Sequence, residues 1–124
     1  MKQCLAILAV ALSLVACSSP EAGDTCSPDG SGTCSSNTEA LFCESGTLRA
    51  IPCSGATGCI DDNDRVACDF SRALAGQACP RAVENQGQCA TGQPDNALVC
   101  TSGTWTTRTC KGCALQGGNV VCQP

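Results

Sequence analysis

The sequence predicts a small disulfide-rich β protein, built as two tandem modules of short β-hairpins with little helix apart from a signal peptide. The first observation is its 14 cysteines in 124 residues, a density typical of disulfide scaffolds in oxidising compartments. The second is that these cysteines recur in two sets of six. The third is a shortage of large apolar residues, with two Phe, one Trp and no Tyr, so a large hydrophobic core is excluded.

Residues 1–16 are predicted to be an export signal. Lys2 precedes an apolar run whose length suits a signal-peptide core and is too short for a relaxed membrane span. The run ends in Leu14-Val15-Ala16-Cys17, which resembles the lipobox of bacterial lipoproteins. The resemblance implies that the Cys17 thiol takes a diacylglycerol, that the leader is cut before Cys17, and that the new amine is acylated. The alternative is an ordinary secretory signal followed by chance by a cysteine.

Residues 17–25 are interpreted as the acylated Cys17 and a flexible tether, because Ser18 to Asp24 are small and polar without an apolar period. Several acyl chains together hold a protein firmly to a bilayer. In the sorting pattern of bacterial lipoproteins an Asp after the lipidated cysteine favours the inner membrane. Ser18 stands there instead, which implies the outer membrane.

Two six-cysteine modules are expected, at 26–69 and 79–124, with a linker at 70–78. Small residues recur together with the cysteines, for example Ser45-Gly46-Thr47 and Ser102-Gly103-Thr104, so duplication of one unit is the simplest account. The first set is Cys26, Cys34, Cys43, Cys53, Cys59 and Cys68, and the second is Cys79, Cys89, Cys100, Cys110, Cys113 and Cys122.

This repeated pattern of Gly and Cys looks like that of the small cysteine-rich lipoproteins of myxobacteria and related bacteria, which implies a location in the cell envelope and little about activity. A fainter similarity, to six-cysteine chitin-binding modules of the peritrophin type, rests on the run from Cys100 to Gly103 and on Trp105 nearby. The chain departs from that second pattern because most of the aromatic residues that such modules use are absent.

Each module is predicted to contain two hairpins. Two-residue loops at Ser45-Gly46 and Ser102-Gly103 place Cys43 opposite Leu48 and Cys100 opposite Trp105. Loops at Asn63-Asp64 and Gly117-Gly118 place the fifth cysteine of each module opposite the sixth.

Opposite cysteines in an antiparallel ladder lie within disulfide range, so the fifth and sixth cysteines are expected to pair. For the remaining four, a first-to-third and second-to-fourth pairing is the working hypothesis. The expected disulfides are Cys59–Cys68 and Cys113–Cys122, then Cys26–Cys43, Cys34–Cys53, Cys79–Cys100 and Cys89–Cys110.

No enzyme class is supported, and no catalytic residue, metal or cofactor is expected. The chain has no His, which removes histidine acid-base chemistry, serine triads and histidine metal ligands. Cys110 and Cys113 have the spacing of a redox or zinc motif, but their counterparts Cys53 and Cys59 are further apart and no βαβ pattern surrounds them. A structural role is therefore expected for this pair.

The expected function is that of a structural or protein-interaction lipoprotein of the bacterial cell envelope, anchored by Cys17 on the periplasmic or surface face. An envelope protein or a polysaccharide is the expected partner, and nucleic acid is disfavoured by the net charge of −4. The alternative is carbohydrate binding, with Trp105 stacked on a sugar and Arg108 and Lys111 contacting acidic groups. Packing of Trp105 beside Cys100 is the preferred interpretation of that residue.

Overall fold

The structure is a computed structural model that describes residues 18–63, 65–117 and 119–123. Within these ranges every regular element is a β-strand except η1 (Arg81–Val83), a single 3-10 turn. The predicted class, a small disulfide-rich β protein of short hairpins, is therefore confirmed. The strands are β1 (Gly32–Ser36), β2 (Glu39–Glu44), β3 (Thr47–Pro52), β4 (Cys59–Asp62), β5 (Arg65–Cys68), β6 (Gly87–Cys89), β7 (Asn96–Thr101), β8 (Thr104–Thr109), β9 (Gly112–Gln116) and β10 (Asn119–Gln123).

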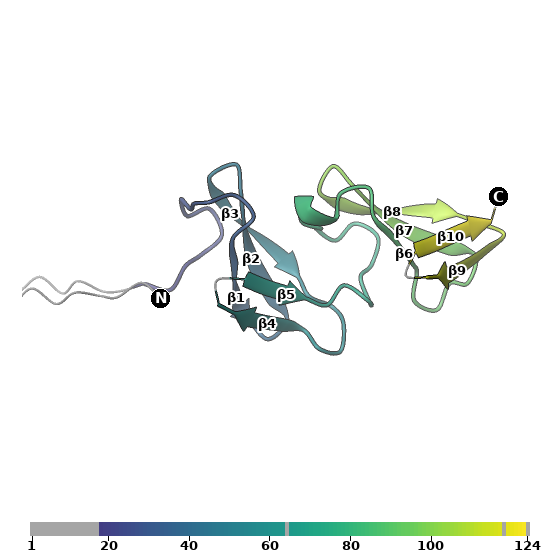
Figure 1. The fold of residues 1–124 in the computed structure, drawn as a ribbon, viewed down its shortest axis with the longest axis horizontal. Helices are drawn as coiled ribbons and strands as arrows, with labels where there is room; N and C mark the ends of the chain where they lie inside the picture. Colours follow the sequence, from purple (N-terminus) through teal and green to yellow (C-terminus); the bar gives the residue numbers. More distant parts are fainter. Residues whose placement is uncertain (1–17, 64, 118, 124) are drawn as a thin grey trace, which may run out of the picture.

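The same arrangement of antiparallel sheets occurs twice along the chain (Figure 1). Residues 26–69, here called the first half, contain a three-stranded sheet in the order β1-β2-β3 and a hairpin of β4 and β5. Residues 79–123, the second half, contain a three-stranded sheet in the order β6-β7-β8 and a hairpin of β9 and β10.

The turns form at the residues that the sequence indicates. Ser45 and Gly46 have φ of 53° and 78°, and Ser102 and Gly103 have φ of 50° and 78°. Two consecutive positive φ values define the turn type that matches the twist of a hairpin. Cys43 consequently lies opposite Leu48 and Cys100 opposite Trp105, as the two-residue loops predict.

The second hairpin of each half also has the predicted register. Cys59 lies opposite Cys68 and Cys113 opposite Cys122. The loop residues Asp64 and Gly118 lie outside the described residues.

The disulfides agree with the sequence prediction only in part. Cys26–Cys43 and Cys79–Cys100 are the expected first-to-third pairs. The expected pairs Cys59–Cys68, Cys113–Cys122, Cys34–Cys53 and Cys89–Cys110 do not form. In both halves the second cysteine instead pairs with the fifth and the fourth with the sixth, as Cys34–Cys59, Cys53–Cys68, Cys89–Cys113 and Cys110–Cys122.

Sheet geometry explains why the second-to-fourth pair fails. Cys34 lies on β1 and Cys53 directly follows β3, with β2 between these two strands. Two strand spacings amount to about 10 Å, beyond the roughly 7 Å that a disulfide spans. Cys89 on β6 and Cys110 after β8 are separated by β7 in the same way.

Cys59 and Cys68 lie opposite each other on the β4–β5 hairpin but do not bond to each other. Cys59 and Cys68 both bond to the three-stranded sheet, at Cys34 and Cys53, with Cα atoms 5.8 and 5.0 Å apart. Each hairpin is too small to bury a face of its own. The two bridges therefore join one layer to the other, which a bond within the hairpin could not do.

The first half has its core between these two layers. Ala40 and Phe42 on β2 and Ile51 on β3 pack with Cys53, and Val66 of the small hairpin covers them from the other layer. Ala40, Ile51 and Cys53 are completely buried.

The segment predicted as a linker, residues 70–78, packs against both halves. Phe70 packs against the cores of both halves and Ala73 is buried in the second. Gly76 donates its backbone N–H to Trp105, and Ala78 forms a β-bridge with Thr104. The segment therefore covers one face of β7 and β8.

The end of the segment predicted as a tether, residues 17–25, likewise contacts the fold. Gly23 donates its backbone N–H to Leu48, and Thr25 forms a β-bridge with Thr47. These contacts repeat those of Gly76 and Ala78 in the second half. Cys17 itself lies outside the described residues.

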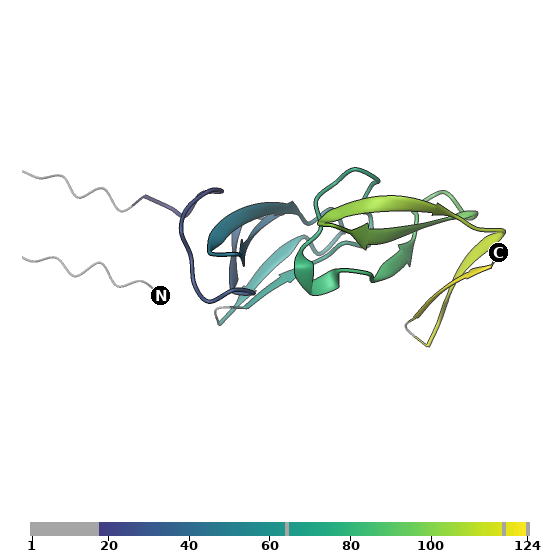
Figure 2. The same ribbon diagram turned by 90° about the horizontal axis from the view of Figure 1, so that it is seen from above.

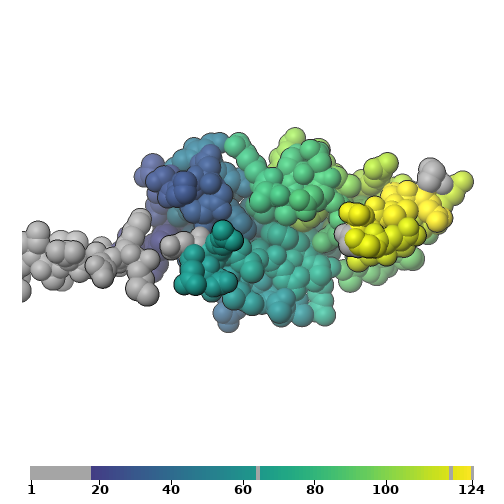
Figure 3. All heavy atoms as spheres, viewed as in Figure 1, coloured from purple at the N-terminus to yellow at the C-terminus, as the bar shows by residue number. Residues whose placement is uncertain are grey.

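The halves lie one after the other along the long axis of the molecule (Figures 1 and 3). The N-terminal segment leaves the first half at one end, and the hairpin of β9 and β10 projects from the opposite end (Figure 2). The termini of the described chain are therefore far apart.

Candidate functional site

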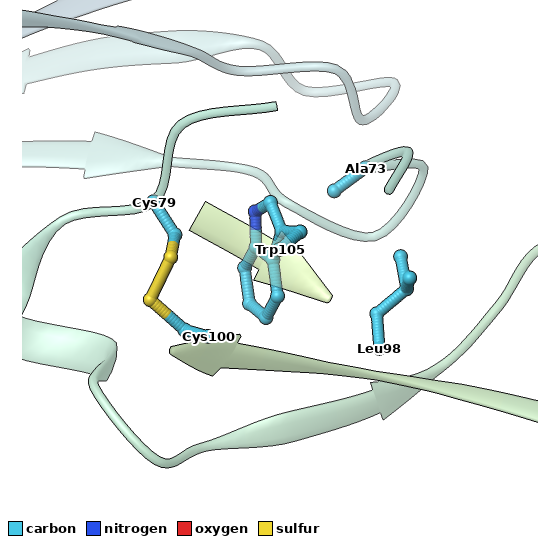
Figure 4. Packing of buried hydrophobic residues seen from close by; sticks show 5 residues of the cluster. All are labelled: Ala73, Cys79, Leu98, Cys100 and Trp105. Atoms are coloured by element: carbon cyan, nitrogen blue, oxygen red, sulfur yellow. A yellow bond between two sulfur atoms is a disulfide. The ribbon is translucent and has the colours of Figure 1, made fainter. Parts of the chain in front are cut away.

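Trp105 lies in the core of the second half (Figure 4). Its side chain is 3% exposed and packs with Leu98, Ala73 and the Cys79–Cys100 disulfide. The ring of Phe70 approaches from the 70–78 segment, with centroids 5.9 Å apart and the planes tilted by 57°. Such tilted contacts are favourable between aromatic rings. The buried indole leaves no face open for a sugar to stack on, which favours the packing role of Trp105.

Arg108 and Lys111 do not join Trp105 in a common site. Successive side chains of a strand point to opposite faces, so Arg108, three residues after Trp105 on β8, points to the other face of the sheet. Lys111 follows Cys110, and its backbone N–H donates to Gln123. Both residues are exposed. The three residues of the expected sugar contact are therefore not brought together.

The cysteine pair with redox spacing is divided between two bridges. Cys110 bonds to Cys122 and Cys113 bonds to Cys89. No cysteine in the described ranges is free. Among the same residues no cluster of His, Cys, Asp or Glu is placed to hold a metal ion.

An open groove of about 710 Å³ lies where the two halves meet. It was not anticipated from the sequence. Two pairs of opposite charge line it, one from each half, and the tip of the β7–β8 turn completes it. The lining residues are Glu44, Arg49, Arg81, Glu84, Ser102 and Gly103.

Arg49 lines this groove and bonds to both halves. Its Nη1 donates to the Cys79 carbonyl at 2.8 Å and lies 3.2 Å from the Glu44 carboxylate, while its Nη2 donates to the Gly103 carbonyl. Glu44 also accepts the backbone N–H of Arg81 at 2.8 Å. Arg49 and Glu44 therefore bond to each other and also to backbone groups of the second half.

Glu84 closes the other side of the groove. Its carboxylate accepts the backbone N–H groups of Ser102 at 2.6 Å and Gly103 at 3.3 Å. Asp29 of the first half makes the corresponding bond to Gly46 at 3.0 Å. An acidic side chain therefore orders the same turn in each half. Comparing the halves position by position is the sequence signal that could have found this role.

A smaller groove of about 310 Å³ lies beside the β4–β5 hairpin, around Asp69. The Asp69 carboxylate accepts the Thr57 hydroxyl at 2.6 Å, the Thr57 N–H at 3.1 Å and the Ser71 N–H at 2.9 Å. These bonds, led by that from the Thr57 hydroxyl, hold the pKa of Asp69 well below its usual value near 3.8. Gly55 permits this arrangement, because a Cβ there would lie 1.9 Å from the carboxyl carbon of Asp69. This groove therefore holds an ordered carboxylate whose role is local structure.

Comparison with known proteins gives no relative, since no family model, no curated protein and no solved structure matches the chain. In the part of the chain that the structure describes, no helix has the length and apolar character needed to cross a bilayer.

Proposed function

We propose that the chain is a lipid-anchored protein of the bacterial cell envelope, acylated at Cys17, with a structural or protein-interaction role. The observation that carries the proposal is the Leu14-Val15-Ala16-Cys17 sequence after an apolar leader. The proposed anchor would also lie close to the fold. Gly23 is already bonded to Leu48, so an acyl group on Cys17 would hold the first half close to the bilayer.

The stapled architecture fits an exposed extracytoplasmic setting. Apolar burial alone scarcely stabilises units of this size. Each half carries three disulfides, and each bridge contributes roughly 2 to 4 kcal/mol. Such bridges persist in oxidising compartments. They support a location outside the cytoplasm, as in the small cysteine-rich lipoproteins that the sequence resembles.

We further infer that the two halves are copies of one duplicated unit. Both pair their cysteines first to third, second to fifth and fourth to sixth. Both also contain a three-stranded sheet followed by a small hairpin. The anchored protein would therefore present two similar modules one after the other, with the β9–β10 hairpin furthest from the anchor.

The anchor is tested by Cys17→Ala in a bacterial host, with Cys4→Ala as the matched control because both cysteines lie outside the described fold. The parent and Cys4→Ala should lose the leader and partition into the detergent phase. Cys17→Ala should carry no acyl group and should accumulate as precursor that keeps the leader. A Cys17→Ala protein that is matured and still partitions with detergent contradicts the proposal.

The outer-membrane assignment needs a separate measurement. Ser18→Asp should move the protein from the outer-membrane to the inner-membrane fraction of a density gradient. An unchanged distribution argues against sorting by the residue after Cys17.

A further inference from the structure

We infer that Arg49 joins the two halves into one rigid unit. The two halves then keep a fixed relative orientation and do not move independently about a flexible linker. Arg49 belongs to β3 of the first half, and both of its carbonyl partners, Cys79 and Gly103, belong to the second. In the opposite direction, the backbone N–H of Arg81 in the second half donates to the Glu44 carboxylate in the first. The bonds therefore run in both directions across the junction.

The chemistry of Arg49 suits a fixed joint. A guanidinium is a planar fork of donors, so it holds several acceptors at set angles, which a single ammonium cannot do. Its two terminal nitrogens are occupied by carbonyls of separate segments, and the Glu44 carboxylate balances its charge. The side chains of Arg49 and Glu44 are 34% and 11% exposed. Hydrogen bonds to charged groups contribute more to stability than neutral ones.

The corresponding positions of the second half show that this pair is specific to the junction. Thr101 stands where the first half has Glu44, and Thr106 stands where it has Arg49, as the shared register places them. The two hydroxyls lie 3.2 Å apart and bond to each other. The charged pair is therefore present in the first half, where it faces the second, and short side chains replace it at the same positions of the second half.

The glycines of the two equivalent turns, Gly46 and Gly103, also differ in what surrounds them. Gly46 and Gly103 occupy equivalent turns with the same φ of 78°. A Cβ on Gly103 would lie 3.0 Å from each terminal nitrogen of Arg49, whereas a Cβ on Gly46 would meet nothing within 4 Å. Gly103 thus has a second role besides the turn, because it leaves room for the Arg49 guanidinium.

Apolar contacts support the joint without fixing its angle. Phe70 packs against the cores of both halves, and Ala78 packs against the first. Ser54 also donates to the side chain of Gln77 at 3.1 Å. The joint would hold the β9–β10 hairpin at a constant distance and direction from the first half, and so within a limited distance of a bilayer anchor at Cys17. That limit rests on the proposed function, whereas the joint itself does not.

The joint is tested by NMR on residues 17–124, secreted with Cys17→Ser so that no acyl group is added and every described residue is kept. The backbone N–H of Arg81 reports the junction directly, since it bonds to Glu44 across the two halves. The variants are Arg49→Lys, which keeps the charge and loses the fork, and Gly103→Ala. Gly46→Ala is the matched control because it carries the same φ and no neighbouring guanidinium.

In the parent and in Gly46→Ala we expect a protected Arg81 amide and one common rotational diffusion tensor for both halves. Arg49→Lys should raise the Arg81 exchange rate by about tenfold or more, as expected when charged hydrogen bonds across the junction are lost, and Gly103→Ala should raise it by a smaller factor because the end of the Arg49 side chain can shift. The two halves should then tumble with different tensors. Unchanged exchange and common tumbling in both variants would overturn the inference, as would equal effects of Gly103→Ala and Gly46→Ala.

Discussion

Replacing Trp105 by alanine should lower the free energy of unfolding by about 4 kcal/mol. The side chain is 3% exposed, and a buried Trp removes about 150 to 250 Å² from water. Losing roughly 150 Å² of this at about 25 cal/mol per Å² gives ~4 kcal/mol. That figure lies within the ~3 to 5 kcal/mol typical of a buried Trp→Ala change.

Trp105→Phe is the informative companion, because the indole N–H of Trp105 has no hydrogen-bond acceptor among the described residues. A buried donor without a partner costs about 1 to 3 kcal/mol. Removing it offsets the loss of the larger ring, so Trp105→Phe should stay within about 1 kcal/mol of the parent.

The assay is guanidinium unfolding of the oxidised proteins, followed by far-ultraviolet circular dichroism because the variants lack the fluorophore. Mass spectrometry first establishes that all cysteines are paired. A loss below about 1 kcal/mol for Trp105→Ala refutes the packing argument. It would return Trp105 to the candidates for ligand contact.

Three further predictions concern local structure. Gly58→Ala should destabilise the first half much more than Gly92→Ala destabilises the second, measured by thermal unfolding, because a Cβ on Gly58 would lie 2.0 Å from the Asn37 carbonyl oxygen and one on Gly92 meets nothing within 4 Å; equal losses would contradict the clash. The pKa of Asp69 is lower in the folded state, so its contribution is present above the usual value near 3.8 and is lost as the pH falls below it. Unfolding at several pH values should therefore show a weaker acid dependence for Asp69→Asn than for the parent, and identical dependences would contradict this. Reduction of all disulfides should unfold both halves and abolish the near-ultraviolet circular dichroism, whereas a native spectrum in excess reductant would show that the cores suffice without the bridges.

Features that depend on residues close together in the chain, such as turns and hairpin register, can be predicted from the sequence. The Ser-Gly turns fix the register of the first hairpin in each half, which is why Cys43 opposite Leu48 and Cys100 opposite Trp105 are found as expected. A two-residue loop leaves a single way to count outward along the strands. The fold class follows from the cysteine density and the scarcity of aromatic residues.

The cysteine pairing and the junction depend on how layers stack, which local patterns do not contain. Cys59 and Cys68 are opposite each other, yet each bonds across to the three-stranded sheet. No sequence pattern considered above involves Arg49, and its carbonyl partners at Cys79 and Gly103 follow only from the contact between the halves. Side chains that act between layers thus need the tertiary structure to be recognised.

The central proposal, a lipid anchor at Cys17, is tested most directly by intact mass and fragment analysis of the mature N-terminal peptide isolated from bacterial membranes. We expect this peptide to begin at Cys17, to carry a diacylglycerol on the Cys17 sulfur, and to be acylated on the amine. A mature chain that begins at another residue, or a Cys17 without lipid, would contradict the account.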